Sequence, residues 1–373
     1  MKDEICQAVL AREEVVRFLQ GGHGETAEQA RERVEGYLDE LNTTQRYGLY
    51  RALKHPVYPI LRKIARHVEH IDRVQAAVAR GRVIYASNHK SHTDYLVEPL
   101  VLDDHGIRPP IIAAGINLFG GPLGLLHRHV TGAIPIRRAT KDQAYLVTLK
   151  AYVAELLREH DLLFYPEGGR SYSGELKPPK TGLIHAAMQS ETRNLVILPV
   201  AIAYDLVLED RSLSRQGVKR RQRPFAREVA EMMRYAVGYR SRAFVSFGEP
   251  IATGAYDPHS RTDVLELAHR TRDAIGRLYK VMPTALVARA MRPSISRPDL
   301  EARVDGLLEA LRAGGANLAV DSGRQAVSEA TRPLARRGVV VVEAGTYRVR
   351  NRALLRYYAR TIEHLLPAAG RAH

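Results

Sequence analysis

Short apolar runs alternate with segments of helical periodicity through the middle of the chain. The runs are rich in β-branched residues and bounded by glycine, proline or polar residues, and they predict strands at 83–86, 110–114, 132–136, 162–165, 196–203 and 243–247. Between them, apolar residues three and four positions apart predict helices near 93–104, 142–159, 181–190, 225–237 and 262–280. This alternation is typical of an α/β fold with a central mixed sheet flanked by helices.

The two flanks of this middle part have a different pattern. Residues 1–80 carry apolar residues at helical spacing, and Pro56 and Pro59 separate the predicted helical segments 26–53 and 57–79. After Pro283, the pattern predicts helices at 284–292, 298–313 and 323–336, a β-hairpin at 338–349 and a helix at 352–366. We therefore expect an N-terminal helical region (1–80), an α/β domain (81–282) and a C-terminal helical region with a β-hairpin (283–373), which has the outline of a winged helix.

Composition adds a strong positive charge. The 373 residues include 56 Lys and Arg against 41 Asp and Glu, a formal net charge of +15. This charge favours an anionic partner, such as nucleic acid, phospholipid headgroups or a phosphorylated small molecule. The single cysteine, Cys6, excludes an internal disulfide and a cysteine-based zinc site and fits a cytoplasmic compartment. The acidic N-terminus lacks the pattern of a secretory signal, so we expect the chain not to be exported.

One uncharged stretch, 109–126, approaches the length of a membrane span. It contains four glycines, three prolines and Asn117. This composition suits a strand, a glycine-rich turn and a short apolar helix better than a spanning helix.

The most informative polar pattern follows the strand predicted at 83–86. His89 and Asp94 stand five positions apart in the sequence Asn-His-Lys-Ser-His-Thr-Asp. A histidine can take a proton from a hydroxyl, while a carboxylate on its other ring nitrogen fixes the tautomer. Because α/β sheets carry chemistry at strand ends, the spacing indicates a base–carboxylate pair. An exposed loop histidine, with Asp94 as a charge at a helix N-terminus, remains the alternative, and the spacing alone does not decide between them.

Two further groups of polar residues and glycines also follow predicted strands. Paired arginines after 132–136 suit a phosphate, or form a solvated strand end. In the turn after 162–165, two adjacent glycines let the backbone approach a ligand closely. The candidate binding residues from these turns and from the segment after them are Arg137, Arg138, Glu167, Gly168, Gly169, Arg170 and Lys180. The apolar run 196–203, which Pro199 interrupts, is interpreted as a buried core strand with a bulge.

In combination and order, these motifs resemble the four motifs of the glycerolipid acyltransferases. The sequences 89–96 and 113–118 are closest to the glycerol-3-phosphate acyltransferase branch, that is, the bacterial enzymes and their mitochondrial relatives. The resemblance covers about residue 80 to the C-terminus, and 355–366 is similar to the end of that branch. There are two departures: the chain is shorter than typical members, and Tyr172 stands where the branch commonly has a second arginine.

The resemblance implies a glycerol-phosphate acyltransferase fold and the transfer of an acyl group from acyl-CoA or acyl carrier protein to the sn-1 hydroxyl of glycerol 3-phosphate, the first step of phospholipid synthesis. His89 is then the general base, which Asp94 orients. Arg138 and Arg170 are the leading phosphate ligands and are expected to point into the same pocket as His89. Glu167 is expected to orient an arginine or to bind a substrate hydroxyl.

The resemblance also implies the surroundings of the reaction. No metal or cofactor is expected beyond the acyl donor. The expected partners are the two substrates and an anionic membrane surface, on the inner face of the cell membrane. Residues 116–126 are a candidate lip for the acyl chain, and the basic run 211–227 either contacts lipid headgroups or is a solvated loop. His92 is expected to have a structural role.

Two alternatives stay open. The first keeps the chemistry but takes lysophosphatidate or dihydroxyacetone phosphate as the acceptor. The second is a nucleic-acid-binding protein built on the winged-helix outline, whose predicted helix 323–336 carries Arg324, Gln325, Arg332 and Arg336. Because the second alternative leaves the ordered motifs unexplained, we expect no nucleic-acid partner.

Overall fold

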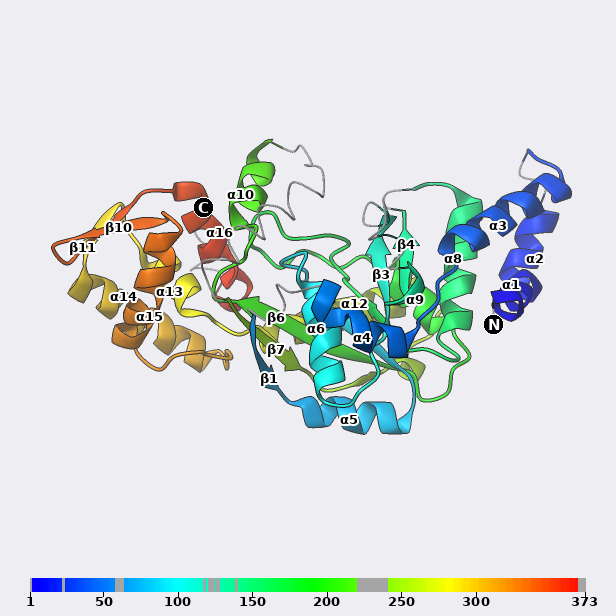
Figure 1. Cartoon of the computed structure of the whole chain (residues 1–373), viewed down its shortest axis with the longest axis horizontal. Coiled ribbons are helices and arrows are strands. Elements are labelled where there is room, and N and C mark those ends of the chain that lie inside the picture. Colours follow the sequence, from blue (N-terminus) through cyan, green and yellow to red (C-terminus); the bar gives the residue numbers. More distant parts are fainter. Residues whose placement is uncertain are drawn as a thin grey trace.

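The protein has three parts that follow one another along its longest axis (Figure 1). A bundle of N-terminal helices lies at one end, the sheet is in the middle, and the C-terminal unit lies at the other end. The computed structural model describes residues 2–21, 24–57, 64–116, 119, 124, 128–137, 140–219 and 241–367.

In the part of the chain that the structure describes, the middle part is built on a mixed sheet of 8 strands. Its strands are β1 (Ala65–Glu69), β2 (Val83–Ser87), β3 (Ile111–Gly115), β4 (Ala133–Ile136), β5 (Leu162–Phe164), β6 (Val196–Tyr204), β7 (Arg242–Phe247) and β8 (Ile251–Ala252). The order is β1-β7-β6-β2-β5-β3-β4, with β8 beside β6. Strands β6, β2, β5, β3 and β4 run parallel, whereas β7 and β8 are antiparallel to β6. The carboxyl ends of the five parallel strands therefore meet at one edge of the sheet, which is where α/β proteins bind ligands.

Helices cover the sheet and keep its central strands buried. All five residues of β2 are buried, as are those of β5. The helices of this part are α5 (Ile71–Arg80), α6 (Asp94–Asp104), α8 (Gln143–Leu156), α9 (Gly182–Met188), α10 (Asp210–Lys219) and α12 (Arg261–Leu278). Since a parallel strand is covered on both faces, its sequence is a continuous apolar run, which explains why the predicted strands are confirmed. The helix predicted at 225–237 lies outside the described residues.

The N-terminal region is not helical throughout, so that prediction is wrong for residues 65–69. Helices α1 (Lys2–Ala11), α2 (Glu13–Gln20), α3 (Ala27–Leu41) and α4 (Tyr47–Val57) form as expected, and the first three pack on α8. Residues 65–69, however, form β1, which pairs in parallel with β7. Ile64 and Val68 stand four positions apart and imitate a helix, whereas the partner that makes them a strand is far away in the sequence. His70, with φ 62°, separates β1 from α5.

The C-terminal unit confirms the winged-helix outline. Its elements are α13 (Pro283–Ala290), β9 (Ser294–Ser296), α14 (Arg297–Ala313), α15 (Gly323–Arg336), β10 (Val340–Glu343), β11 (Thr346–Val349) and α16 (Arg352–Arg360). The three strands form an antiparallel sheet in the order β10-β11-β9. Strand β9, only three residues long, was not predicted. Helix α16 packs on α10, which joins this unit to the middle part.

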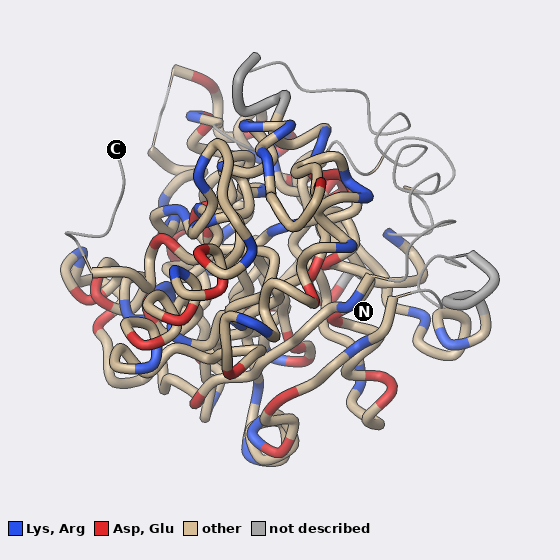
Figure 2. Tube along the Cα trace, turned by 90° about the vertical axis from the view of Figure 1, so that its left-hand side faces the viewer, with Lys and Arg blue, Asp and Glu red and all other residues tan. Residues whose placement is uncertain are grey.

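No helix among the described residues combines the length and the apolar character needed to cross a membrane. Seen from the side of the C-terminal unit, basic and acidic segments both occur along the traced chain, so this side is not of one sign (Figure 2). Most of the candidate lip 116–126 and most side chains of the basic run 211–227 lie outside the described residues.

Candidate active site

Strand β2 and helix α6 bring His89 and Asp94 together at the carboxyl edge of the sheet. His89 Nδ1 lies 2.9 Å from Asp94 Oδ2. His89 is 5% exposed and Asp94 is fully buried, at 0%. Because a carboxylate accepts, Nδ1 carries the proton of a neutral imidazole, and Nε2 is the nitrogen suited to act as a base. The structure thus contains a buried histidine–carboxylate pair and not an exposed loop histidine.

Three further donors surround the Asp94 carboxylate. Oδ2 accepts from the amides of Lys90 at 2.7 Å and Ser91 at 2.9 Å, and Oδ1 accepts from the Tyr204 hydroxyl at 2.8 Å. Burial raises the pKa of Asp94 to about 7, although the hydrogen bonds from Ser91, Tyr204 and Lys90 oppose this rise. Tyr204 is the last residue of β6, and the sequence analysis missed it because an apolar strand gives no sign of which tyrosine reaches across the edge.

A second carboxyl, Glu98, is buried one helical turn after Asp94. It accepts from the Ser87 hydroxyl and, at 2.9 Å, from the Tyr165 hydroxyl. Burial, together with the charge of Asp94, raises the pKa of Glu98 well above its usual range. The Tyr165 ring stacks on the His89 imidazole, with centroids 4.1 Å apart and planes 15° apart. The sequence analysis missed Glu98, whose only sign is a lone acid in the apolar part of α6.

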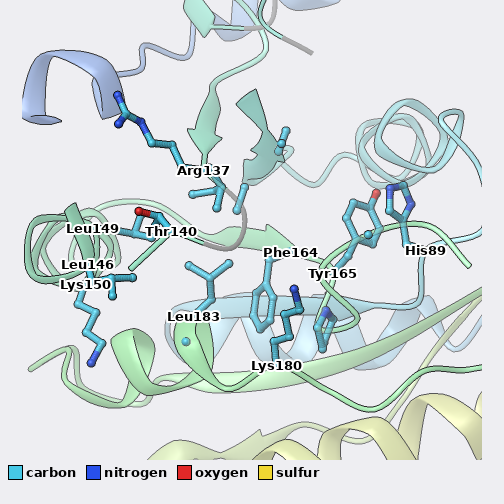
Figure 3. Close-up of a pocket in the computed structure, with 18 of the residues that line it drawn as sticks. His89, Arg137, Thr140, Leu146, Leu149, Lys150, Phe164, Tyr165, Lys180 and Leu183 are labelled. Atoms are coloured by element: carbon cyan, nitrogen blue, oxygen red, sulfur yellow. The ribbon is translucent and has the colours of Figure 1, made fainter. Parts of the chain in front are cut away.

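His89 and Tyr165 lie at one end of a cavity of about 260 Å³ (Figure 3). Its volume is slightly below the roughly 300–1,000 Å³ common for ligand pockets. Leu146, Leu149 and the stem of Lys150 lie toward the other end. Further lining residues come from β3, β4 and α9, namely Ala113, Ala114, Gly115, Ile136 and Leu183. The cavity is therefore an apolar channel with the histidine at one end, which suits a flexible apolar chain.

The turn after β5 is tied to the loop after β2 through Glu167. One oxygen of its carboxylate accepts from the His89 amide and the other from the Lys177 amide, both at 3.0 Å. The Ser171 amide in turn donates to the His89 carbonyl at 3.0 Å. The sequence analysis expected Glu167 to orient an arginine or to bind a substrate hydroxyl, but its hydrogen bonds in the described part of the chain are with backbone amides and not with an arginine. Glu167 fixes the position of the histidine loop.

Glycine is required at position 168, where the Lys180 side chain crosses the turn. Gly168 has φ +68°, and a Cβ there would lie 2.6 Å from Lys180 Cδ. Its amide donates to the Tyr165 carbonyl at 2.9 Å. Gly168, Gly169 and Lys180 all line the cavity. Lys180 is exposed, and its amine reaches toward the space beside Phe164 and Tyr165 (Figure 3).

Arg137, which directly follows β4, faces helix α3. The Arg137 guanidinium pairs with Glu40 of α3 at 2.8 Å and lies over the rings of Tyr37 and Tyr145. In Figure 3 it points away from the cavity, although Arg137 is one of the lining residues. Arg138 lies outside the described residues.

Arg170, like Arg137, pairs with a carboxylate and lies over an aromatic ring. Its Nη1 lies 3.5 Å from Glu209 Oε1, and its guanidinium lies over the Tyr172 ring at 5.7 Å. Arg170 is not among the described residues that line the cavity. Glu209, an acid that the sequence analysis did not single out, holds Arg170 beside the loop that carries His89.

The remaining polar residues of the His89 loop hold the loop in place. Glu209 accepts from the Ser91 hydroxyl at 2.8 Å and from the His92 amide at 2.6 Å. The buried Lys90 ammonium donates to the Gly174 carbonyl at 2.7 Å and lies over the Tyr279 ring. Burial lowers the pKa of Lys90. These contacts support a structural role for the loop residues around the histidine.

Among the described residues, no group of three or more His, Cys, Asp or Glu side chains is arranged to hold a metal ion.

Comparison with known proteins agrees with this geometry. Residues 65–203, which run from β1 to the end of β6, match the family model named Acyltransferase. A glycerol-3-phosphate acyltransferase of Actinobacillus succinogenes is 34% identical over 248 residues, which are 63% of this chain and 30% of that protein. The enzyme of the same name from Aeromonas hydrophila is 33% identical over 62% of this chain and 30% of its own length.

A third relative aligns over the whole chain. The glycerol-3-phosphate acyltransferase of Pseudoalteromonas atlantica is 27% identical over 99% of this chain and 50% of its own length. The chain thus spans about 30% to 50% of the length of these curated relatives. The matched region contains the histidine–aspartate pair and the turn after β5, so the resemblance to the glycerolipid acyltransferases, and among them to the glycerol-3-phosphate acyltransferases, is confirmed.

Proposed function

We propose that the chain transfers an acyl group from acyl-CoA or acyl carrier protein to the sn-1 hydroxyl of glycerol 3-phosphate, with His89 as general base. One observation carries the proposal: the His89–Asp94 pair, 2.9 Å apart, lies at the end of an apolar cavity in a chain that resembles this family. The pair takes the proton of the acceptor hydroxyl, and the cavity accommodates the acyl chain. The product is lysophosphatidate.

The reaction follows from the two nitrogens of the imidazole. Asp94 holds Nδ1–H, so His89 Nε2 takes the hydroxyl proton as the substrate oxygen attacks the thioester carbonyl carbon. The C–O bond forms, the C–S bond of the tetrahedral intermediate then breaks, and the leaving thiolate receives the proton from His89. The products are the ester and the free thiol. The substrate hydroxyl takes the place of the serine of a protease triad, so the protein needs no nucleophile of its own.

The turn after β5 offers a donor for the oxyanion of the intermediate. The Gly169 amide is the candidate, because Gly169 lines the cavity while the Gly168 amide already donates to Tyr165. One such donor accounts for about 10² to 10³ in rate in enzymes where it has been removed. No metal or further cofactor enters this scheme, since a thiolate is a good leaving group and His89 returns its proton.

Among the phosphate candidates, Lys180 has the strongest support. Its side chain crosses Gly168 and lines the cavity of His89. Arg137 and Arg170, in contrast, face the carboxylates of Glu40 and Glu209. We therefore assign the substrate phosphate first to Lys180, and retain Arg138, Arg137 and Arg170 as ligands implied by the resemblance.

The enzyme is further proposed to work on an anionic membrane surface, on the inner face of the cell membrane. The net charge of +15 and an acyl substrate support this location. Vesicle flotation tests it: the protein should float with phosphatidylglycerol vesicles at low salt and less at high salt. Equal recovery with neutral vesicles would contradict an electrostatic attachment.

The acyl-transfer proposal is tested by assaying the purified chain with radiolabelled glycerol 3-phosphate and either acyl-CoA or acyl carrier protein donors. Lysophosphatidate acylated at the sn-1 position is expected with at least one donor. His89→Ala, purified in parallel, excludes activity carried over from the host. Unlabelled lysophosphatidate and dihydroxyacetone phosphate are offered as competing acceptors. If neither donor yields lysophosphatidate, or if another acceptor is acylated with a higher kcat/KM, the substrate assignment is wrong.

A further inference from the structure

Tyr165 and Glu98 form a contact chain to His89 that the proposed reaction does not use. The Tyr165 ring is stacked almost parallel on the imidazole, 4.1 Å away, and its hydroxyl donates to Glu98 at 2.9 Å. Glu98 is also anchored at the end of β2, where it accepts from the Ser87 hydroxyl. This chain of contacts thus connects α6, through the residue that follows β5, to the loop after β2.

The chain of contacts fixes the imidazole from the side that Asp94 does not reach. Asp94 holds one ring nitrogen in the plane of the ring, which leaves rotation about the Nδ1–Oδ2 direction possible. A ring stacked on the face of the imidazole restricts that rotation. Tyr165 itself is restrained at its hydroxyl, and Glu98, which is 1% exposed, is held in the packed interior of α6. The imidazole plane is therefore determined by the partly buried Tyr165 and the buried Glu98, besides its carboxylate partner.

The stack also favours one charge state of the base. The negative face of an aromatic ring attracts a cation, and the attraction is larger where water is excluded. In the reaction His89 becomes an imidazolium only after it has taken the hydroxyl proton. The face of the tyrosine ring at this distance therefore stabilises the imidazolium form of His89, which is present while the tetrahedral intermediate exists.

We propose that Tyr165, anchored by Glu98, is a positioning residue for the base, which fixes the plane of the His89 ring and stabilises its protonated form. Glu98 acts in this contact chain as a neutral acid, because it is enclosed beside Asp94 with the hydroxyl groups of Ser87 and Tyr165 as its hydrogen-bond partners. In the neutral form the oxygen beside Ser87 carries the proton and donates to Ser87 Oγ, whose own hydrogen then goes to the Asn88 carbonyl. A neutral Glu98 adds no charge that would compete with Asp94. The catalytic part of this inference rests on the proposed acyl transfer.

Other charged and titratable groups face His89 and are held constant in the test. Asp94 contacts it from α6, and Tyr204 of β6 contacts Asp94. From the surrounding loops come Glu167 on its amide, Lys90 in the same loop and Lys180 on the cavity wall. None of these is changed by substitutions at 98 or 165.

The first measurement is an NMR titration of the histidine Cε1–H signals, which needs no substrate. The chain has 15 histidines, so the His89 signal is identified by its absence from His89→Gln. Tyr165→Leu is expected to lower the midpoint of the His89 titration by about 0.5 pH unit or more, because the aromatic face is lost. Tyr165→Phe keeps the ring, and Glu98→Gln keeps a neutral hydrogen-bonding group, so both should retain the wild-type midpoint.

The second measurement is steady-state kinetics of the same variants. Tyr165→Leu should lower kcat about tenfold, a part of the 10² to 10⁴ that general base catalysis contributes. Glu98→Ala should lose a similar factor, and Glu98→Gln should restore it. Tyr347→Leu is the matched control: this buried tyrosine of the C-terminal unit, whose hydroxyl contacts Thr331, should leave both the midpoint and kcat unchanged.

The outcomes separate this inference from the proposed function. An unchanged His89 midpoint in Tyr165→Leu, or a shifted midpoint in Glu98→Gln, overturns the inference whether or not the enzyme acylates glycerol 3-phosphate. If Tyr165→Leu does not fold, the nearly isosteric Tyr165→Phe and Glu98→Gln decide. A shifted His89 midpoint in Tyr165→Phe would contradict stabilisation by the stacked ring, and a shifted His89 midpoint in Glu98→Gln would contradict a neutral Glu98. A wild type without activity but with the expected shifts contradicts the proposed function alone.

Discussion

Two buried hydrogen-bonded clusters, one around Asp94 and Glu98 at the catalytic edge and one around Asp210 at the junction with the C-terminal unit, differ in the groups that donate to their acids. At the junction, Asp210 accepts from the Arg337 guanidinium at 2.9 Å and from the Tyr358 hydroxyl. Arg337 also donates to the carbonyls of Val207 and Leu208. At the catalytic edge, Asp94 and Glu98 accept from amides, hydroxyls and the His89 ring, and no guanidinium in the described part of the chain donates to them.

This difference separates a structural cluster from a functional one. A buried ion pair with further hydrogen bonds holds two elements together, and its loss leaves an uncompensated charge. Burial raises the pKa of Asp210, Asp94 and Glu98 alike, but only the last two lie beside the histidine that lines the cavity, and buried acids of raised pKa beside a cavity are typical of active sites. Arg337 and Asp210 therefore attach the C-terminal unit to the middle part, whereas Asp94 and Glu98 hold the catalytic histidine in position.

The largest effect on stability is expected from Arg337→Ala. Removing the guanidinium leaves Asp210 buried without its counter-charge, which costs about 3–5 kcal/mol of unfolding free energy. Chemical denaturation measures the loss, and the kcat of the folded fraction should stay at the wild-type value. Arg336→Ala, at the exposed last residue of α15 directly before Arg337, is the matched control and should change little. A lower kcat in folded Arg337→Ala would break the distinction between the two clusters.

A smaller, pH-dependent effect is expected from Glu98→Gln. Glutamate in an unfolded chain titrates near pH 4.3, and the folded pKa of Glu98 is higher, so the folded state retains a proton that the unfolded state releases. Wild-type stability therefore falls as the pH rises above about 4.3, by up to about 1.4 kcal/mol per pH unit from this group. Glutamine removes that contribution.

Denaturation of both proteins from pH 5 to pH 8 measures this effect. The free energy of unfolding of Glu98→Gln, relative to that of the wild type, should increase as the pH rises. Asp94 lowers the free energy of unfolding of both proteins similarly over this range. Glu343→Gln, at an exposed acid of the hairpin, should show no such trend. Parallel stability curves for the wild type and Glu98→Gln would show that Glu98 is ionised in the folded protein.

The smallest effect is expected at the far end of the cavity. Leu149 lines that end, and Leu149→Phe shortens the channel. The ratio of kcat/KM for palmitoyl to that for lauroyl donors should fall about tenfold, a value typical of small changes in hydrophobic pockets. Leu149→Ala should move the ratio in the opposite direction. Ratios that stay constant in both variants would show that the acyl chain lies elsewhere.

The sequence predicted the features that depend on neighbouring residues. Strands β2 to β7 were found because their apolar runs are local, whereas β1 and the two-residue β8 were not predicted. His89 and Asp94 were found because the strand-to-helix turn joins residues five positions apart. The winged-helix outline followed in the same way from the helical patterns and the hairpin. Local pattern and tertiary structure agree in these elements.

The features that were missed depend on contacts between distant segments. Strand β1 forms because β7, far along the chain, completes its ladder. The partners of Arg137 and Arg170, which are Glu40 and Glu209, lie in helices and loops that no motif connects to them. The register of α6 against β5, which places Glu98 on Tyr165, is likewise set by packing and not by sequence pattern.

The most direct test of the histidine–aspartate assignment is the rate of lysophosphatidate formation by Asp94→Asn. The substitution keeps the shape of the side chain but no longer fixes the tautomer of His89, so kcat should fall on the order of 10⁴-fold, as in the equivalent pair of a serine protease. Asp104→Asn, at the other end of α6, controls for the loss of an acid on this helix and should keep wild-type activity. A folded Asp94→Asn enzyme with kcat within tenfold of the wild type would contradict the account.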